Sequence, residues 1–375
     1  MVGLSIANNV SDLILGDVRE HLPLDRIPLS GDVLGLGTTT SIDNGELSFL
    51  QSAEGDTKIW KCQAHDGSVR ELRHGDGSGH FPYVCFTADA TAFRRPFDLQ
   101  RLDPSCCSLQ GLISEAISIS RCEGELEEAS IYGIRLMSFW QELVITIASK
   151  LCMGQQRRNS QIASSKSGDA TASRSLYELL QHYRLAASDP CQQDDPIQFL
   201  GNSLQWDCCG FFDMEPTSGR VTVPEPGAHL HLHGCSTDLR FGGHLHHEHS
   251  SSRLNSLGRL VIYPIQQINY LASDLSIEKL TYCGQTVDFT VTNRGTLDVS
   301  DVGVAVVVND RFGDHRYLRL PWLAAGEQES FSLDWPLLKG QHRVEVIADP
   351  EGDVLEDPKL LGNNRMSLLV NISSS

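Results

Sequence analysis

Short runs in which apolar and polar residues alternate cover most of the chain, and this pattern predicts antiparallel β-strands. Hairpin signals at Asn44-Gly45 and His65-Asp66-Gly67 separate several of these runs in the first quarter. Helical spacing of apolar residues occurs at 4–20, and again within 97–120 after Pro104. A long apolar run at 130–149 is expected to hold one or two strands. The pattern predicts an α+β domain over residues 1–270, made mostly of antiparallel β-strands.

The composition shifts between about residues 154 and 195. This stretch is polar and poor in large apolar residues, which is typical of a flexible insertion. Within it, residues 175–187 have the spacing of a short amphipathic helix. Strand-like runs resume at 199–216 and 220–234, and the last of the domain is 259–271.

The last hundred residues have a different pattern. Turn signals separate seven short strand-like runs, which predicts an all-β sandwich of the immunoglobulin-like type over residues 273–371. The seven runs are 276–282, 286–295, 303–310, 315–323, 329–337, 342–349 and 366–372.

The charge and the cysteine pattern argue against some classes of function. The chain has 375 residues and a formal net charge of −18, which disfavours binding to nucleic acid. Its 11 cysteines include no C-x-x-C pair, so a thiolate zinc ribbon is not expected. Neither a signal peptide nor an 18-residue apolar span is visible. These features predict free thiols in the cytoplasm, with export as the alternative.

Candidate chemistry concentrates in residues 227–249, where seven of the 14 histidines lie. His229, His231 and His233 are spaced by two, which places three imidazoles on one face of a strand. A turn follows, and Gly242-Gly243 then presents His244. Three imidazoles with an open fourth position form a recurring catalytic zinc site, although imidazole also suits copper, iron and nickel. The bland alternative is a chelating polar loop, and we expect the final segment, 246–249, to be solvated loop.

Several motifs in order resemble the alpha-acetolactate decarboxylase family over residues 1–270. Its glycine-rich G-L-G-T and D-G-E segment is similar to SGDVLGLGTTTSIDNGELSFLQ at 30–51. Further matches are IWKCQAHDGSVREL with FPYVCFT, IYGIRLMSFWQEL and CGFFDMEP. The most specific match is VPEPGAHLHLHGCSTDLRFGGHL at 223–245.

This resemblance implies a zinc-dependent enzyme that converts 2-acetolactate to acetoin and CO2, as in acetoin and butanediol biosynthesis. It implies His231, His233 and His244 as zinc ligands, with His229 replacing one of them if the turn is longer. It places Glu46 beside the metal as the catalytic carboxylate. In this scheme the metal stabilises an enediolate intermediate. A homodimer is also implied.

Two departures from the family pattern affect the expected activity. Thr146 stands where the family has an arginine, and Lys150, Arg157 or Arg158 are possible substitutes. No counterpart of the family's C-terminal glutamate can be assigned. The alternatives are therefore a catalytically degenerate relative that acts as a metal-containing binding or adhesion protein, and a PPC-type DNA-associated domain, which also carries H-x-H and G-G-H. The net charge and the G-L-G-T segment count against the PPC reading.

The C-terminal sandwich resembles the CARDB family of cell-adhesion-related domains. The similar segments are VTNRGTLDVSDVGVAVVVND, LAAGEQESFSLDW and ADPEGDVLEDPKLLGNNR. This resemblance implies a spacer or adhesion module and a cell-surface setting.

Overall fold

The computed structural model divides the chain into two compact units, Met1–Tyr270 and Leu271–Ser375. It describes residues 2–14, 21–39, 45–63, 67–75, 80–103, 108–147, 198–309, 315–352, 354, 356 and 360–373. The polar segment at 154–195 and the helix expected within it lie outside the described residues, as do Asn44, His65 and Asp66 of the two hairpin signals. Lys150, Arg157 and Arg158 lie outside them as well.

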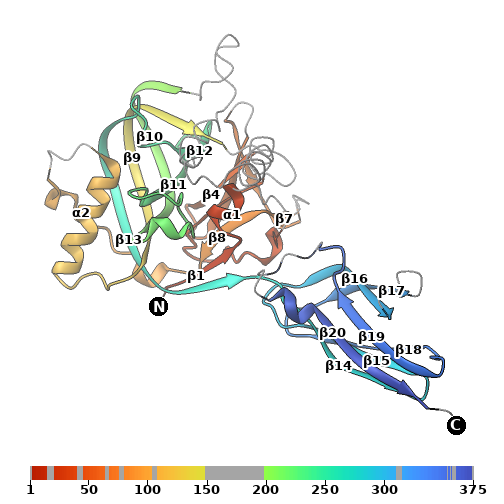
Figure 1. Ribbon diagram of the computed structural model, residues 1–375. Coiled ribbons are helices and arrows are strands. Elements are labelled where there is room, and N and C mark those ends of the chain that lie inside the picture. Colours follow the sequence, from red (N-terminus) through yellow and green to blue (C-terminus); the bar gives the residue numbers. More distant parts are fainter. Residues whose placement is uncertain are drawn as a thin grey trace, which may run out of the picture. The chain divides into compact units, whose positions relative to one another are not determined.

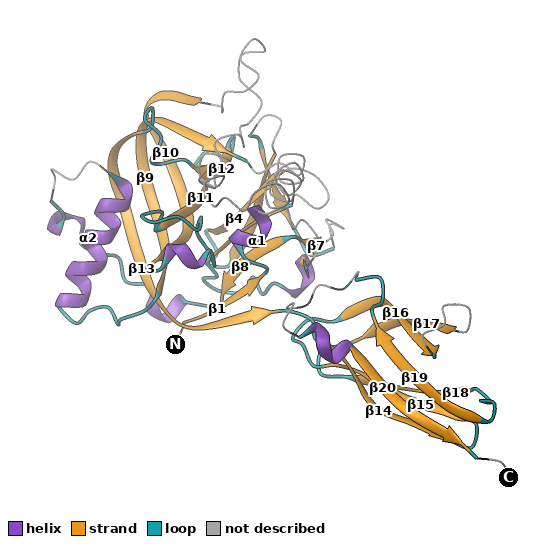
Figure 2. Cartoon of the chain, in the orientation of Figure 1, coloured by secondary structure: helices purple, strands orange, loops and turns teal. Residues whose placement is uncertain are grey.

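The first unit is built on one eleven-stranded sheet (Figures 1 and 2). The order of the strands is β10-β11-β12-β9-β13-β1-β8-β3-β4-β5-β6. The pairings from β10 to β13 and from β1 to β6 are antiparallel. The bounds are β1 Val2–Ala7, β3 Gly35–Thr38, β4 Gly45–Gln51, β5 Thr57–Gln63, β6 Val69–Leu72, β8 Tyr83–Thr87, β9 Ile131–Thr146, β10 Gln198–Asp213, β11 Leu230–Ser236, β12 Gly242–Leu245 and β13 Arg253–Leu271. A separate pair joins β2 Leu22–Pro23 to β7 His80–Phe81.

Helices are few within the described part of the first unit. They are α1 Val10–Ile14, α2 Leu109–Cys122 and the 3-10 turns η1 Leu24–Arg26, η2 Thr91–Phe93, η3 Leu99–Arg101 and η5 Pro216–Ser218. The α2 helix begins where Ser108 accepts a hydrogen bond from the Gly111 amide, as an N-cap residue does. The fold is therefore mainly β, and the helical share that the α+β label implies is limited to these short segments.

The expected helix over residues 4–20 is wrong at its start. Residues Val2–Ala7 form β1, in which Leu4 pairs with Thr87 and Ile6 with Cys85 of β8. Helical structure begins only at Val10. The reason is that Val2, Leu4 and Ile6 also alternate with a period of two, so the same residues suit a strand buried between two neighbours.

Strands β9 to β12 form a closed ring of pairings. β9 pairs with β10 along most of its length, β10 pairs with β11, β11 with β12, and the end of β9 pairs with β12. Strand β4 of the other half of the sheet packs against β10, β11 and β12. This packing brings β4, the end of the first motif, onto the histidine segment.

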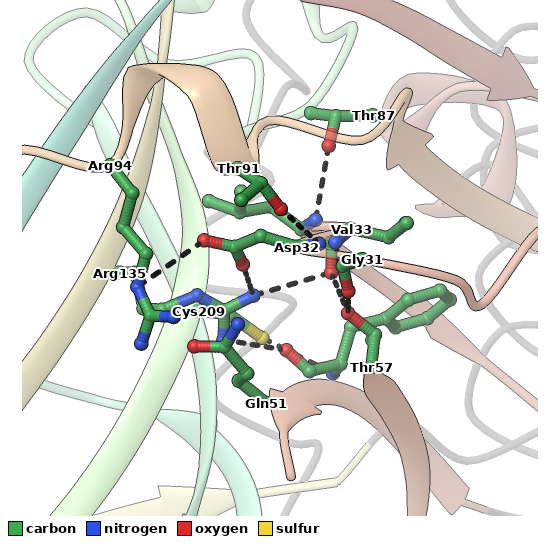
Figure 3. Close-up of polar contacts among 12 residues, drawn as sticks. Gly31, Asp32, Val33, Gln51, Thr57, Thr87, Thr91, Arg94, Arg135 and Cys209 are labelled. Carbon is green, nitrogen blue, oxygen red and sulfur yellow. Dashed lines mark hydrogen bonds and ion pairs between the residues drawn. The ribbon is translucent and has the colours of Figure 1, made fainter. Parts of the chain in front are cut away.

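A buried ion pair joins the two halves of the sheet (Figure 3). Arg135 of β9 lies 2.7 Å from Asp32, and both side chains are almost fully shielded from solvent. The guanidinium also donates to the carbonyls of Phe49 and Val33, at 3.2 and 3.3 Å. The Tyr263 hydroxyl of β13 donates to the second Asp32 oxygen at 2.7 Å. The network therefore fixes β3 and β4 against β9 and β13.

The described residues of the second unit form seven strands in two sheets, β14-β15-β18 and β17-β16-β19-β20. Its core is apolar and includes Phe289, Val304, Trp335 and Val346. Two sheets around one apolar core form the sandwich that the turn spacing predicts. The bounds are β14 Leu275–Cys283, β15 Thr286–Asn293, β16 Val299–Val308, β17 His315–Leu323, β18 Gln328–Asp334, β19 Gly340–Ala348, η6 Leu361–Asn364 and β20 Arg365–Ile372.

Candidate metal centre

Three histidine side chains converge inside the first unit. His231 and His233 come from β11 and His244 from β12, and one ring nitrogen of each lies within 4.8 Å of the others. The ring centroids are 4.9 Å apart for His231 and His233, 4.9 Å for His231 and His244, and 5.7 Å for His233 and His244. Among the described residues, this is the only group of three or more His, Cys, Asp or Glu side chains so placed.

Strand register explains why these side chains meet. His233 pairs directly with His244, and residues paired across antiparallel strands project from the same face. His231 lies two residues before His233, so it shares that face. The sequence H-x-H therefore supplies two ligands from one strand, and the turn to Gly242-Gly243 returns the chain in register with the third.

Close strand approach at β10 also supports the site. Gly210 lies opposite Leu232, and a Cβ atom on Gly210 would stand 2.0 Å from the carbonyl oxygen of His231. Only glycine fits at this position, because any side chain would push the His231 backbone away.

Two backbone carbonyls fix the imidazole tautomers. Nδ1 of His231 lies 2.5 Å from the Val221 carbonyl, and Nδ1 of His233 lies 2.8 Å from the Leu47 carbonyl. A carbonyl only accepts hydrogen bonds, so both Nδ1 atoms carry the proton and both Nε2 atoms carry a lone pair. These two Nε2 atoms are 3.1 Å apart. Two lone pairs facing each other at this distance repel, and a shared cation would remove the repulsion.

Burial of the imidazoles favours a metal ion over a proton as the cation shared by the two Nε2 atoms. Desolvation lowers the pKa of His231 to about 4, and it holds the pKa of His233 and His244 well below the usual range for histidine. The three imidazoles are therefore neutral at physiological pH, which is the form that binds a metal. A hydrogen bond from the second ring nitrogen to a carbonyl is the usual support of a histidine ligand. The residues present thus fit a divalent transition metal.

Glu46 approaches the cluster from β4. Its carboxylate lies 3.8 Å from Nε2 of His233, and its side chain is 8% exposed. The next residue, Leu47, provides the carbonyl that accepts from His233, so β4 contributes both a carboxylate and a tautomer-fixing group. Packing of β4 on β11 and β12 accounts for the position of Glu46.

His229 does not join the cluster. Strand β11 begins at Leu230, so His229 precedes it and the expected row of three imidazoles contains only two. The His229 ring stacks on Phe212 at a centroid distance of 5.4 Å, and its Nδ1 lies 2.7 Å from the Asp213 carbonyl. Its backbone amide donates to Gln110 of α2. These contacts hold the ring outside the set of three.

Thr146 lies next to the cluster. It is the last residue of β9 and pairs directly with His244, so the two share a face, and it is 9% exposed. The position at which the sequence resemblance implied an arginine is thus beside the histidines, occupied by a hydroxyl. The carbonyls of Val221 and Leu47 were missed from the sequence, because a backbone carbonyl carries no residue-type signal.

The segment after His244 departs from the expectation of a solvated loop. His246 is 8% exposed, and its amide donates to the Val144 carbonyl at 3.0 Å, which continues the pairing beyond β12. The side chain of His247 is 7% exposed. The buried region around β12 thus extends to His246 and His247, although the sequence there is polar.

Comparisons with known proteins separate the two units. Residues 274–367 match the model of the CARDB family, which confirms the expected C-terminal domain. A solution structure of a CARDB domain from Pyrococcus furiosus is 23% identical and covers 27% of this chain and 95% of that chain, with a TM-score of 0.23. A crystal structure of that domain in complex with di-metal ions is 22% identical, with a coverage of 27% and 90% and a TM-score of 0.23.

Similar solved structures for the larger part of the chain include an alpha-acetolactate decarboxylase from Bacillus subtilis strain 168. It is 15% identical and covers 72% of this chain and 88% of that chain, with a TM-score of 0.42. No curated protein matches the chain. Among the described residues, no helix has both the length and the apolar character needed to cross a membrane. The comparisons do not support the cytoplasmic location expected from the cysteines.

Proposed function

We propose that the first unit binds a divalent metal, zinc by preference, through His231, His233 and His244, and decarboxylates 2-acetolactate to acetoin and CO2. The observation that carries this proposal is the pair of Nε2 lone pairs held 3.1 Å apart by two carbonyl-fixed tautomers. The order of the motifs at 30–51, 131–143 and 223–245 supports the choice of substrate. Three neutral ligands leave the full positive charge of the metal available to an anionic substrate.

When bound, the metal supplies a Lewis acid for the negative charge that remains after CO2 departs. The chain's own residues do the rest. The Val221 and Leu47 carbonyls hold the imidazoles in one orientation, so no reorganisation is needed during the reaction. The buried walls of β4, β11 and β12 keep water away from the reacting carbon.

Glu46 is proposed to hold and deliver the proton that replaces CO2. Its carboxylate is 3.8 Å from His233, too far for a direct hydrogen bond but close enough to reach a substrate bound beside His233. Its burial limits exchange with bulk water, so a proton held there is transferred to the substrate rather than lost to solvent.

The test measures zinc content and acetoin release on the same purified sample. We expect about one zinc per chain and turnover in the wild type, and the loss of both in His231→Ala. His229→Ala serves as the control, because its ring stacks on Phe212 outside the cluster and its loss should leave the zinc content unchanged. Stoichiometric zinc in purified His231→Ala would exclude this ligand assignment.

The second candidate is a degenerate relative that keeps the metal without the reaction. Thr146 beside His244 favours it, because a hydroxyl cannot neutralise a substrate carboxylate as an arginine does. This candidate predicts one zinc per chain and no acetoin. In that case the CARDB domain suggests that the protein is exported and acts as a metal-containing binding or adhesion protein.

A further inference from the structure

The segment that follows β12 forms an ordered rim beside the histidine cluster. Two hydrogen bonds to one carbonyl close it, since the His249 amide donates to the His246 carbonyl at 3.1 Å and the Ser252 hydroxyl donates to the same carbonyl at 2.8 Å. His247 reaches back to β11, where its Nε2 lies 3.3 Å from the Leu230 carbonyl. Because Leu230 precedes His231, the rim lies next to the proposed metal ligands.

Glu248 lies between two imidazoles on this rim. One carboxylate oxygen is 3.4 Å from Nδ1 of His247, and the other is 3.7 Å from Nε2 of His246. Glu248 is 38% exposed, whereas the two histidine side chains are 7% and 10% exposed. The carboxylate therefore faces solvent on one side and two mostly buried imidazoles on the other.

The contact between His247 and Glu248 lacks a proton when the ring is neutral. The Leu230 carbonyl only accepts, so Nε2 of His247 carries the proton and Nδ1 presents a lone pair to the carboxylate. The observed 3.4 Å is close to the separation of two ligand atoms on one tetrahedral zinc, about 3.3–3.5 Å from bonds of about 2.0–2.2 Å.

We propose that this rim is a second, outer site for a divalent transition metal. Nδ1 of His247 and the Glu248 carboxylate hold the ion, and water completes the coordination. With fewer protein ligands and solvent on one side, the outer site binds more weakly and exchanges faster than the buried cluster. Its role is to load the inner site, so this role rests on the proposed metal at His231, His233 and His244.

The test titrates the metal-free full-length chain with Zn²⁺ alone and follows binding by calorimetry. We expect one tight and one weak equivalent for the wild type. Glu248→Gln keeps the shape of the side chain but removes its charge, so it should weaken the second equivalent about 10- to 100-fold and leave the tight one unchanged. In stopped-flow mixing, this variant should also fill the tight site more slowly than the wild type.

His249→Ala is the matched control from the same segment. Nδ1 of His249 accepts a hydrogen bond from the Ser251 amide at 3.1 Å, so this atom is not available to an ion, and both equivalents should remain. A wild type that binds only the tight equivalent would overturn the outer site. Equal weakening in His249→Ala and Glu248→Gln would also overturn it, because that result indicates nonspecific chelation by a histidine-rich loop.

The inner site is tested separately with His231→Ala. We expect this variant to lose the tight equivalent and to keep the weak one, which shows that the outer ligands form their own site. Of the two possible single-class results for the wild type, a tight equivalent alone would overturn the outer site, whereas a weak equivalent alone would refute the proposed function and leave the outer site in place. Loss of both equivalents in His231→Ala would refute an independent outer site.

Discussion

At the scale of a single residue, a substitution of Glu46 should affect catalysis but not metal binding. It faces His233 at 3.8 Å but is not one of the three converging ligands, so Glu46→Gln should keep the zinc content of the wild type. Acetoin release should fall by about 10²–10⁴-fold, the usual contribution of a positioned general acid or base. Zinc analysis and turnover on one preparation measure both quantities.

The control for this prediction is Glu54→Gln. Glu54 lies in the exposed turn after β4, where its side chain accepts from Ser52 and is not buried. Its substitution should change neither zinc content nor turnover. If Glu46→Gln kept wild-type turnover, Glu46 would have no role in proton delivery.

Residue spacing alone predicted much of the cluster. The period of two in H-x-H and the return through Gly242-Gly243 are local signals, and strand register converts them into convergence of His231, His233 and His244. Glu46 carries no such signal, since an acidic residue after a turn is usually solvated, and only the family resemblance singled it out. The choice between His229 and His233 depended on where β11 begins, which local pattern does not determine.

At the level of elements, the close contact between β10 and β11 predicts that a side chain at Gly210 destabilises the protein and weakens zinc binding. Gly210→Ala would place a Cβ 2.0 Å from the His231 carbonyl oxygen, so the strands must separate. We expect the free energy of unfolding to fall by about 1–3 kcal/mol, as for overpacked cores, and zinc affinity to fall with it. Chemical denaturation and zinc titration provide the two readouts.

Gly3→Ala in β1 is the matched control, because the nearest atom to its Cβ is 3.7 Å away, an ordinary van der Waals contact. It should leave zinc affinity unchanged. If Gly210→Ala bound zinc as tightly as the wild type, the close approach of these strands would not determine the position of His231.

The buried pair of Arg135 and Asp32 predicts a large loss of stability when one partner is removed. Asp32→Asn leaves the guanidinium buried without its counter-charge and weakens the bond from Tyr263. We expect the free energy of unfolding to fall by about 3–5 kcal/mol. Asp301→Asn breaks an exposed pair with Arg319 and should cost about 0–1 kcal/mol. Equal, small losses in both variants would show that the buried network does not join the two halves of the sheet.

Short strands bounded by turn signals were the most predictable elements. The seven sandwich strands follow the expected runs closely, because turns separate them at regular intervals. Strand β1 was missed because its neighbours, β8 and β13, lie far away in sequence. Its apolar residues satisfied both periods, and only this long-range pairing decided between them. The pair of Arg135 and Asp32 is equally long-range, so no local pattern indicated it.

At the scale of the whole molecule, each unit has a separate apolar core. Val2, Leu36 and Tyr263 belong to the core of the first unit, and Phe289 and Trp335 to that of the second. Every group assigned to the proposed inner site, from Glu46 to His244, comes from residues within Met1–Tyr270. Metal binding should therefore stabilise one unit without affecting the other.

We accordingly expect two unfolding transitions in calorimetry of the metal-free chain. Zn²⁺ should raise the midpoint temperature of only one of them. At a free zinc concentration one hundred times the dissociation constant, binding contributes about 2.7 kcal/mol to the unit that holds the ion. A chain that ends after Tyr270 should show the zinc-sensitive transition alone, and His231→Ala in the full chain should abolish the shift. If zinc raised the midpoint temperatures of both transitions equally, the metal would not be confined to the first unit. The same conclusion would follow if zinc raised only the midpoint of the transition that the shortened chain lacks.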